Sequence, residues 1–192
     1  WSPIQKLAVI PAIRFDHSND FYSEVTYDLK IALIGLKGSE FSTEIGTNYQ
    51  HPSFDDLYWD GNPELRPEYS DYKNVKWEYK FDQDNFLGVT CMDRKSRDLI
   101  QWSPLDDTSG IWQPFNLEKT RRQSITVFGK TPLKVLPLYF QGHFILLKTL
   151  DEENLKPLPY APDRTGNAGF YFEGKEISWS LQLRYTGERK DS

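Results

Sequence analysis

The stretch EYSDYKNVKWEYKF, residues 68–81, shows the pattern on which this chain is built. From Val75 onward, apolar residues at odd positions alternate with charged residues at even positions. The apolar set is Val75, Trp77, Tyr79 and Phe81. A period of two is typical of a β-strand with one buried face. The stretch therefore predicts a strand, and its partners elsewhere in the chain decide the fold.

The same period recurs along the chain, most clearly in EISWSLQLRY at residues 176–185, where apolar residues alternate with Ser, Gln and Arg. The apolar run at 133–140 is interrupted by Pro137, which in a strand indicates an edge, a bulge or a break. The other predicted strands are residues 25–36, 75–81, 85–94, 124–129 and 143–150. We expect seven or eight strands in total.

The strands are separated by segments rich in glycine and proline, which favour turns and loops. We expect one domain over residues 1–192, opening with an extended segment at 1–20. Long loops are predicted at 37–67 and 151–169, and residues 103–116 also read as a loop.

This organisation predicts an all-β fold of the jelly-roll or Greek-key β-sandwich type, with long loops. Regular meanders use repeated Asn-Gly or Asp-Gly hairpin turns. Here Asp60-Gly61 is the one such dipeptide, and it falls inside the predicted loop at 37–67. An eight-stranded calyx is the competing architecture.

The overall composition predicts a soluble domain that does not insert into a membrane. The 192 residues carry a formal net charge of −5, which argues against strong nucleic-acid binding by this segment itself. The apolar run at 31–36 is far too short for a membrane-spanning helix, and no signal peptide opens the chain. The single cysteine, Cys91, excludes an internal disulfide.

Catalytic and metal-binding patterns are weak, and we expect neither an enzyme nor a cofactor. The three histidines are far apart and show no zinc-binding spacing. The sharpest enzymatic hypothesis is a metal-dependent nuclease built on Glu78 and Lys80. Its distant acid would be Asp60, Glu64 or Asp71. The polar face of a strand explains the same Glu-x-Lys letters without catalysis.

Two sets of residues are candidates for binding. Aromatic side chains in or beside loops suit an interface or a carbohydrate ring: Trp59, Trp102 and Trp112. Basic residues that could meet phosphate are Lys6, Arg14, Arg121 and Arg122. A carbohydrate-binding β-sandwich is therefore the second hypothesis for the function. An inhibitor-like partner protein is a further alternative.

Two segments resemble circovirus-like capsid proteins. The first is Tyr72 followed by Val75-Lys76-Trp77-Glu78-Tyr79, which is similar to an inner strand of those jelly rolls. The second is EISWSLQLRYTGERK at 176–190, which resembles their last strand. The resemblance covers about 30 residues directly and the strand order loosely.

This resemblance implies a viral capsid subunit without enzymatic activity. Such a subunit would assemble with copies of itself into a small icosahedral shell around single-stranded DNA. Viral nucleic acid would be bound mainly by a basic arm upstream of Trp1. The resemblance further implies a location in the virion and in the host nucleus during assembly, and a host-cell glycan as receptor.

Overall fold

The structure is a computed structural model that describes residues 6–18, 21–36, 38–59, 61–105, 110–133 and 137–189. These residues form nine strands and one short helix: β1 (Lys6–Asp16), β2 (Glu24–Leu36), β3 (Ser39–Gln50), α1 (Phe54–Tyr58), β4 (Glu68–Lys80), β5 (Phe86–Pro104), β6 (Trp112–Leu133), β7 (Leu138–Asp151), β8 (Arg164–Glu173) and β9 (Ser178–Thr186). Within this part of the chain, no helix is long and apolar enough to cross a membrane.

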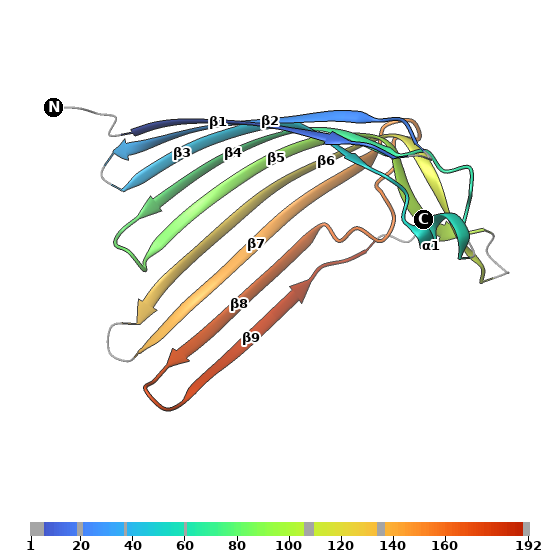
Figure 1. The fold of residues 1–192 in the computed structure, drawn as a ribbon. Coiled ribbons are helices and arrows are strands. Elements are labelled where there is room, and N and C mark those ends of the chain that lie inside the picture. The colour runs from blue at the N-terminus through green and yellow to red at the C-terminus, as the bar shows by residue number, and fades with distance from the viewer. Residues whose placement is uncertain are drawn as a thin grey trace.

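All nine strands belong to one sheet, ordered β1 to β9 as in the sequence. Each strand pairs antiparallel with the next, so the topology is an up-and-down meander. Among the described residues, β1 and β9 have no pairing with each other, so the sheet is open. Figure 1 shows that it curves strongly from one edge to the other.

The prediction of an all-β fold is confirmed, but the jelly-roll sandwich is wrong, because one continuous sheet takes the place of two packed sheets. The absence of Asn-Gly turns misled the sequence argument. The hairpin between β4 and β5 closes through Phe81 N–H, which donates to the carbonyl of Asn85 at 2.8 Å. Asp82 supports it by accepting the N–H of Asp84 at 3.0 Å, which is an Asx turn.

Four strands begin where the sequence predicted loops or an extended segment, and one of them is β6, which begins inside the predicted loop at 103–116. β1 occupies most of the segment at 1–20, β3 lies inside the predicted loop at 37–67, and β8 begins inside the one at 151–169. β3 contains residue types that are depleted in strands and weaken a local strand signal: Glu40, Glu44, Gly46 and Asn48. Its twelve backbone pairs with β4 and its pairing with β2 stabilise it instead.

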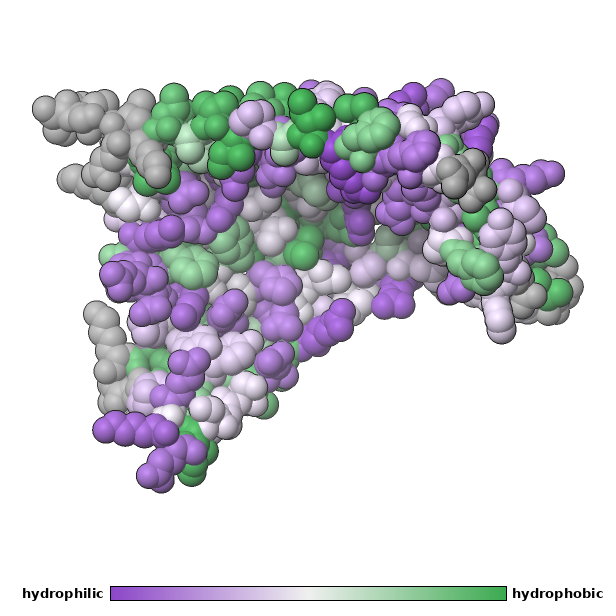
Figure 2. All heavy atoms as spheres, in the orientation of Figure 1, coloured by the Kyte–Doolittle hydropathy of each residue, from purple (hydrophilic) through white to green (hydrophobic). Residues whose placement is uncertain are grey.

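The register places alternate residues of each strand on opposite faces of the sheet, so that apolar and polar positions are separated. Trp77 pairs with Phe41 and with Val89, so these apolar side chains share one face. We call this the outward face, because it lies on the convex side. The opposite, inward face carries polar residues. Figure 2 shows the inward face toward the viewer, mainly purple and pale, with green residues along the upper edge formed by β1 and β2.

Burial in this sheet is inverted relative to a water-soluble sandwich. The buried hydrophobic residues among those described are Ala32, Tyr49 and Leu65. Buried polar side chains are more numerous: Thr26, Glu78, Ser96, Thr120, Thr149 and Asp151. Large apolar side chains such as Val75, Ile125 and Leu181 stay exposed on the outward face. The apolar surface therefore faces away from the polar interior.

The two ends of the strands differ in their connections. At one end, which we call the turn end, short turns join β2 to β3, β4 to β5, and β8 to β9. At the other, which we call the loop end, longer segments join β1 to β2, β3 to β4, and β7 to β8. Helix α1 lies in the loop between β3 and β4 (Figure 1).

A backbone distortion at Asp98 redirects the loop end of β5. Asp98 has a φ of 57°, in the left-handed region, and it interrupts the pairing between β5 and β6. Its carboxylate pairs with Arg66 at 2.6 Å, and its carbonyl accepts from Asn116 at 2.7 Å. Beyond this point β5 and β6 turn away from the rest of the sheet (Figure 1).

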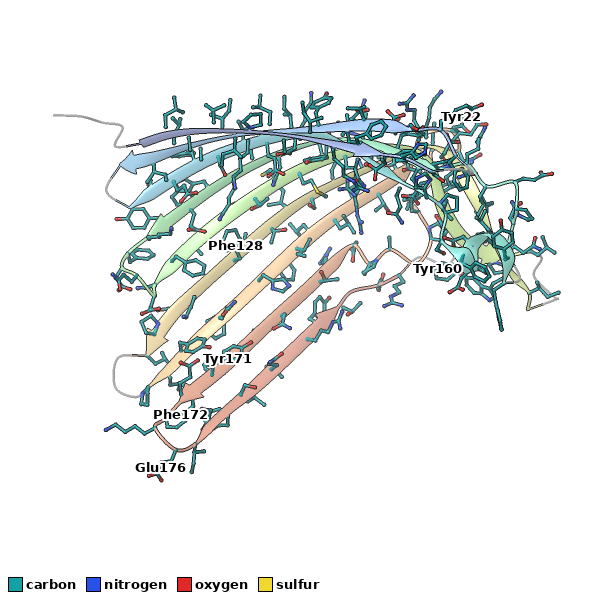
Figure 3. All side chains as sticks on the ribbon, viewed as in Figure 1. Tyr22, Phe128, Tyr160, Tyr171, Phe172 and Glu176 are labelled. Atoms are coloured by element: carbon teal, nitrogen blue, oxygen red, sulfur yellow. The ribbon has the colours of Figure 1, made fainter. Side chains whose placement is uncertain are left out.

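Glycines on the inward face make room for neighbouring aromatic rings. Gly88 of β5 lies directly opposite Phe128 of β6. A Cβ at Gly88 would lie 2.4 Å from Cζ of Phe128, so the ring covers the glycine. Figure 3 shows Phe128 on the inward face. An aromatic ring over a glycine shields the bare backbone and helps to pin the register.

We therefore expect Gly88→Ala to lower the free energy of unfolding by about 1–3 kcal/mol, because the added methyl displaces the Phe128 ring. Chemical unfolding with guanidinium would measure this loss. In a Phe128→Ala background the same Gly88→Ala change should cost less than half as much. An equal loss in both backgrounds would contradict the ring-over-glycine contact.

Candidate functional site

A cavity of about 400 Å³ lies on the inward face, near the loop end of the sheet. We call it the loop-end cavity. Inward-facing side chains of β3 to β7 line it, together with the loop between β7 and β8. Tyr160 of that loop lies at the loop end of the sheet in Figure 3.

The lining of the loop-end cavity is rich in hydroxyl and amide groups. These polar lining residues are Asn48, Gln50, Ser70, Ser96, Gln101, Thr120 and Thr149. Three of them are almost fully buried: Ser96, Thr120 and Thr149. Such groups can both donate and accept hydrogen bonds, so the cavity suits a ligand with many amide or hydroxyl groups.

Two arginines bring positive charge to the cavity. Arg94 and Arg122 are direct partners on β5 and β6. The guanidinium of Arg94 lies 5.8 Å from the ring centre of Tyr72, whose hydroxyl donates to Asp28 at 2.5 Å. The Nε of Arg94 is buried and has no hydrogen-bond partner among the described residues. A buried donor without a partner is costly, and an acceptor on a ligand would relieve that cost.

Glu68 supplies a carboxylate at the first position of β4. The side chain is half-buried, and it lines the loop-end cavity together with Arg94. Its Oε1 accepts the backbone N–H of Ile100 at 2.8 Å. This hydrogen bond ties β4 to the redirected end of β5. Glu68 therefore holds the cavity wall together on the side where the two strands diverge.

Trp102 connects the cavity to helix α1. Its Nε1 donates to Asp56 at 2.8 Å, and Asp56 also closes a capping box with Ser53. Burial alone would raise the pKa of Asp56. The hydrogen bonds from Ser53 and Trp102 outweigh burial and hold that pKa below its ordinary value. The loop between β3 and β4 is thus anchored to the cavity by one carboxylate.

The structure brings together two of the binding residues that the sequence predicted. Trp102 and Arg122 both line the loop-end cavity. Trp112 lies nearby, since its ring centre is 5.4 Å from that of Tyr160. Trp59 ends α1 and is 72% exposed.

The other predicted basic residues lie elsewhere. Arg121 is on the outward face, where its guanidinium pairs with Asp93 at 2.8 Å. Arg14 pairs with Asp16 at the loop end of β1. Lys6 begins β1, and its side chain lies outside the described residues.

The residues of the nuclease hypothesis do not form a site. Glu78 is buried between Lys76 and Lys80, with N–O distances of 2.8 Å and 3.4 Å. Asp71 lies on the outward face, and Asp60 lies outside the described residues. Within the described ranges, no group of three His, Cys, Asp or Glu residues could hold a metal ion. The Glu-x-Lys pattern is part of a polar strand face.

Sequence reasoning missed Arg94 and Glu68 as lining residues. Both lie at even positions of strands whose odd positions are apolar nearer the turn end. The alternation itself therefore places Arg94 and Glu68 on the inward face. That signal becomes useful only when the inward face is known to be the one that meets a ligand.

Comparison with known proteins matches all of residues 1–192 to the family model described as "TonB dependent receptor-like, beta-barrel". The vitamin B12 transporter BtuB of Vibrio vulnificus is 29% identical over 195 residues, which cover 94% of this chain and 29% of the relative. BtuB of Photobacterium profundum is 31% identical over 121 residues, covering 59% of this chain and 19% of that protein. The chain thus spans less than a third of either curated relative.

Solved structures with the same fold include siderophore receptors of Pseudomonas aeruginosa. A mutant of the ferric enterobactin receptor PfeA has a TM-score of 0.75 at 18% identity, covering 97% of this chain and 31% of that one. The siderophore receptor PirA has a TM-score of 0.70 at 17% identity, covering 96% of this chain and 35% of that one. The described sheet is therefore a segment of a receptor-type β-barrel.

These matches overturn the capsid interpretation. The resemblance to circovirus-like capsids rested on strand alternation, which any half-buried strand shows. The predicted shell of identical subunits, viral nucleic acid, glycan receptor, virion and host nucleus are wrong for the same reason. The carbohydrate-binding and nuclease alternatives also fail. The prediction of no membrane insertion is wrong because the exposed apolar face belongs to a barrel wall.

The Asp56 anchor generates a prediction about pH. Because the pKa of Asp56 is lowered in the folded state, its stabilising contribution is complete above the ordinary pKa of 3.8. The contribution is lost as the pH falls from that value through the lowered pKa. We expect Asp56→Asn to speed proteolytic cleavage of residues 51–67 severalfold at pH 7 and to remove most of the wild-type pH dependence below pH 4.

The matched control is Asp55→Asn, in the same helical turn but exposed. It should leave the cleavage rate near that of the wild type. If both substitutions accelerate cleavage equally, the specific anchor through Trp102 is refuted.

Proposed function

Because this chain belongs to the TonB dependent receptor-like β-barrel family, we propose that it forms part of the wall of a bacterial outer-membrane receptor. We propose that the whole receptor takes up cobalamin or a closely related corrinoid, with energy supplied through TonB. The relationship to two BtuB proteins supports this substrate. Transport, without catalysis, is the proposed activity.

The exposed backbone at the edges of the sheet supports a closed barrel. A β-structure crosses lipid only if its strands close, since unpaired N–H and C=O groups are costly in hydrocarbon. β1 and β9 each have one edge without a strand partner among the described residues. In the proposed receptor, further strands pair with these two edges and complete the wall.

The apolar outward face supports a definite orientation in the membrane. Outer-membrane barrels have short turns toward the periplasm and longer loops toward the exterior. The turn end would therefore face the periplasm, and the loop-end cavity would open toward the exterior. Aromatic residues cluster near the turn end of the outward face: Trp77, Tyr79, Phe81, Phe140, Phe170, Phe172 and Trp179. Such girdles mark the interface of a barrel with lipid headgroups.

The lining of the loop-end cavity supports cobalamin as the ligand. Cobalamin carries several side-chain amides and one phosphodiester. The amide and hydroxyl groups of the cavity can pair with those amides, and Arg94 and Arg122 can meet the phosphodiester. Because cobalamin is larger than a cavity of about 400 Å³, this wall would bind one side of it.

A ferric siderophore is the second candidate. The two arginines favour it, because many iron chelates are anionic. The Tyr160 and Trp102 rings would then contact aromatic chelating groups. The same receptor preparation can be offered both ligands, so the two proposals are separable by one experiment.

The arginine pair yields the test of the substrate. We expect Arg122→Ala in the complete receptor to weaken cobalamin binding roughly tenfold or more, since a hydrogen bond to a charged group contributes about 1.5–3 kcal/mol. Titration of the purified receptor with cyanocobalamin, followed by its absorbance, measures the dissociation constant. Growth of cells that depend on external cobalamin measures uptake.

Arg121→Ala is the matched control, because its side chain lies on the opposite face. It should leave cobalamin affinity within about twofold of the wild type, a difference below about 0.5 kcal/mol. A receptor that ignores cobalamin but binds a ferric siderophore, with loss in Arg122→Ala, would replace the first candidate with the second. If neither arginine variant loses ligand affinity, the loop-end cavity is not part of the binding site.

The membrane orientation has a separate test. Val127 lies in the middle of an outward apolar row that also contains Val89 and Phe144. We expect Val127→Lys to lower the free energy of unfolding in lipid vesicles by about 2–4 kcal/mol. Thr126→Lys, one residue away on the inward face, should cost less than about 1 kcal/mol. Equal losses would contradict the assignment of the two faces.

A further inference from the structure

The outward face of β4 to β8 holds a hollow with a basic rim. It measures about 670 Å³, and we call it the basic hollow. Its floor is the apolar row of Val75, Cys91, Ile125 and Leu146. Toward the loop end it is bounded by Lys73, Lys148 and Arg164, all exposed. Charged side chains thus begin where the apolar band stops.

A second, strongly apolar hollow of about 620 Å³ follows toward the turn end. We call it the glycine furrow, because Gly129, Gly142, Gly166 and Ala168 form its floor. These residues are neighbours on β6, β7 and β8. Around them stand larger outward side chains: Leu87, Val127, Phe140, Phe144, Leu183 and Tyr185. The small residues therefore leave a channel within the lipid-facing band.

The two hollows are adjacent on the same strands. The row of Ile125, Leu146 and Arg164 lines the basic hollow, and the row two residues further lines the glycine furrow. Successive outward residues of a strand are about 7 Å apart. Together the hollows make one path that is charged at the loop end and apolar toward the turn end.

The positive charge beside the basic hollow is largely unneutralised. Between the apolar row and the loop end, the outward face of β4 to β7 carries six basic residues: Lys73, Lys95, Arg97, Lys119, Arg121 and Lys148. Two acids, Asp71 and Asp93, share these rows, and Asp93 is paired with Arg121. At the rim, Arg164 pairs with the exposed Asp163 at 3.3 Å. Lys73 and Lys148 have no ion pair with any described carboxylate.

We propose that this path binds one membrane lipid with a phosphate-bearing, anionic headgroup. The headgroup lies against Lys73, Lys148 and Arg164, and one acyl chain lies in the glycine furrow. Basic residues at the edge of a hydrocarbon band attract lipid phosphates, and an acyl chain gains by filling an apolar channel. The inference rests on the membrane placement proposed above, and it is independent of which nutrient is carried.

The position of the path decides against a soluble ligand. Both hollows lie on the outward face, opposite the loop-end cavity, and the furrow lies inside the apolar band. In the proposed orientation the basic rim is level with lipid headgroups on the outer side of the membrane. A transported nutrient would meet the inward face instead.

The test is native mass spectrometry of the complete receptor in detergent with three probes: phosphatidylglycerol, phosphatidylcholine and inorganic phosphate. We expect retained phosphatidylglycerol, less phosphatidylcholine, and no adduct with inorganic phosphate. The Lys73→Gln/Lys148→Gln variant should weaken phosphatidylglycerol binding about tenfold or more. Its charge-matched control, Arg14→Gln/Lys30→Gln on the inward face, should bind like the wild type.

The acyl part of the site is tested by Ala168→Leu, which fills the furrow. It should weaken the binding of both lipids, whereas Thr43→Leu, on the same face outside both hollows, should weaken the binding of neither.

Three outcomes would overturn the proposal: wild-type lipid binding by the lysine variant, equal loss in its inward control, or an adduct with inorganic phosphate alone. Cobalamin uptake is measured in parallel. If uptake persists while lipid binding is unselective, only the lipid site is refuted. If lipid binding is selective but cobalamin is not taken up, only the transport proposal is refuted.

Discussion

The whole structure depends on backbone hydrogen bonding between neighbouring strands of a single sheet. Every strand from β2 to β8 pairs on both sides, and among the described residues no second sheet covers either face. The apolar side chains of each strand therefore cannot reach a common interior. They remain on the convex face, and the concave face receives Ser, Thr, Asn and charged residues. In a barrel wall the lipid provides the apolar contacts that a packed core provides in a soluble protein.

The same pairing explains how a ligand site arises without a local sequence motif. Arg94 and Arg122 come from different strands, and they become neighbours only through the register of β5 and β6. Asp98 then bends the loop end of these strands, so that Trp102 closes the cavity and reaches Asp56 on α1. A wall of inward side chains becomes a cavity because one residue adopts a positive φ.

The alternation of the sequence predicted strands well and their environment badly. Residues 25–36, 75–81 and 176–185 are largely strand in the structure, and the all-β class is right. However, the period of two does not state whether the apolar face meets protein or lipid. β3 was missed because its Glu, Gly and Asn residues weaken the local strand signal, and pairing with β2 and β4 holds it as a strand. The cavity was seen in part, through Trp102 and Arg122, because loop aromatics and basic residues are visible without a register.

Arg121 and Arg122 illustrate what the register adds to the letters. In the sequence they form one basic pair with one expected role. In the sheet they point to opposite faces: Arg121 pairs with Asp93 among the outward basic residues, and Arg122 lies in the loop-end cavity. In the proposed receptor, one residue thus faces the headgroup region and the other faces the transported ligand. Because a shift of one residue would exchange the two, the glycine and aromatic contacts that pin the register also keep both surfaces in place.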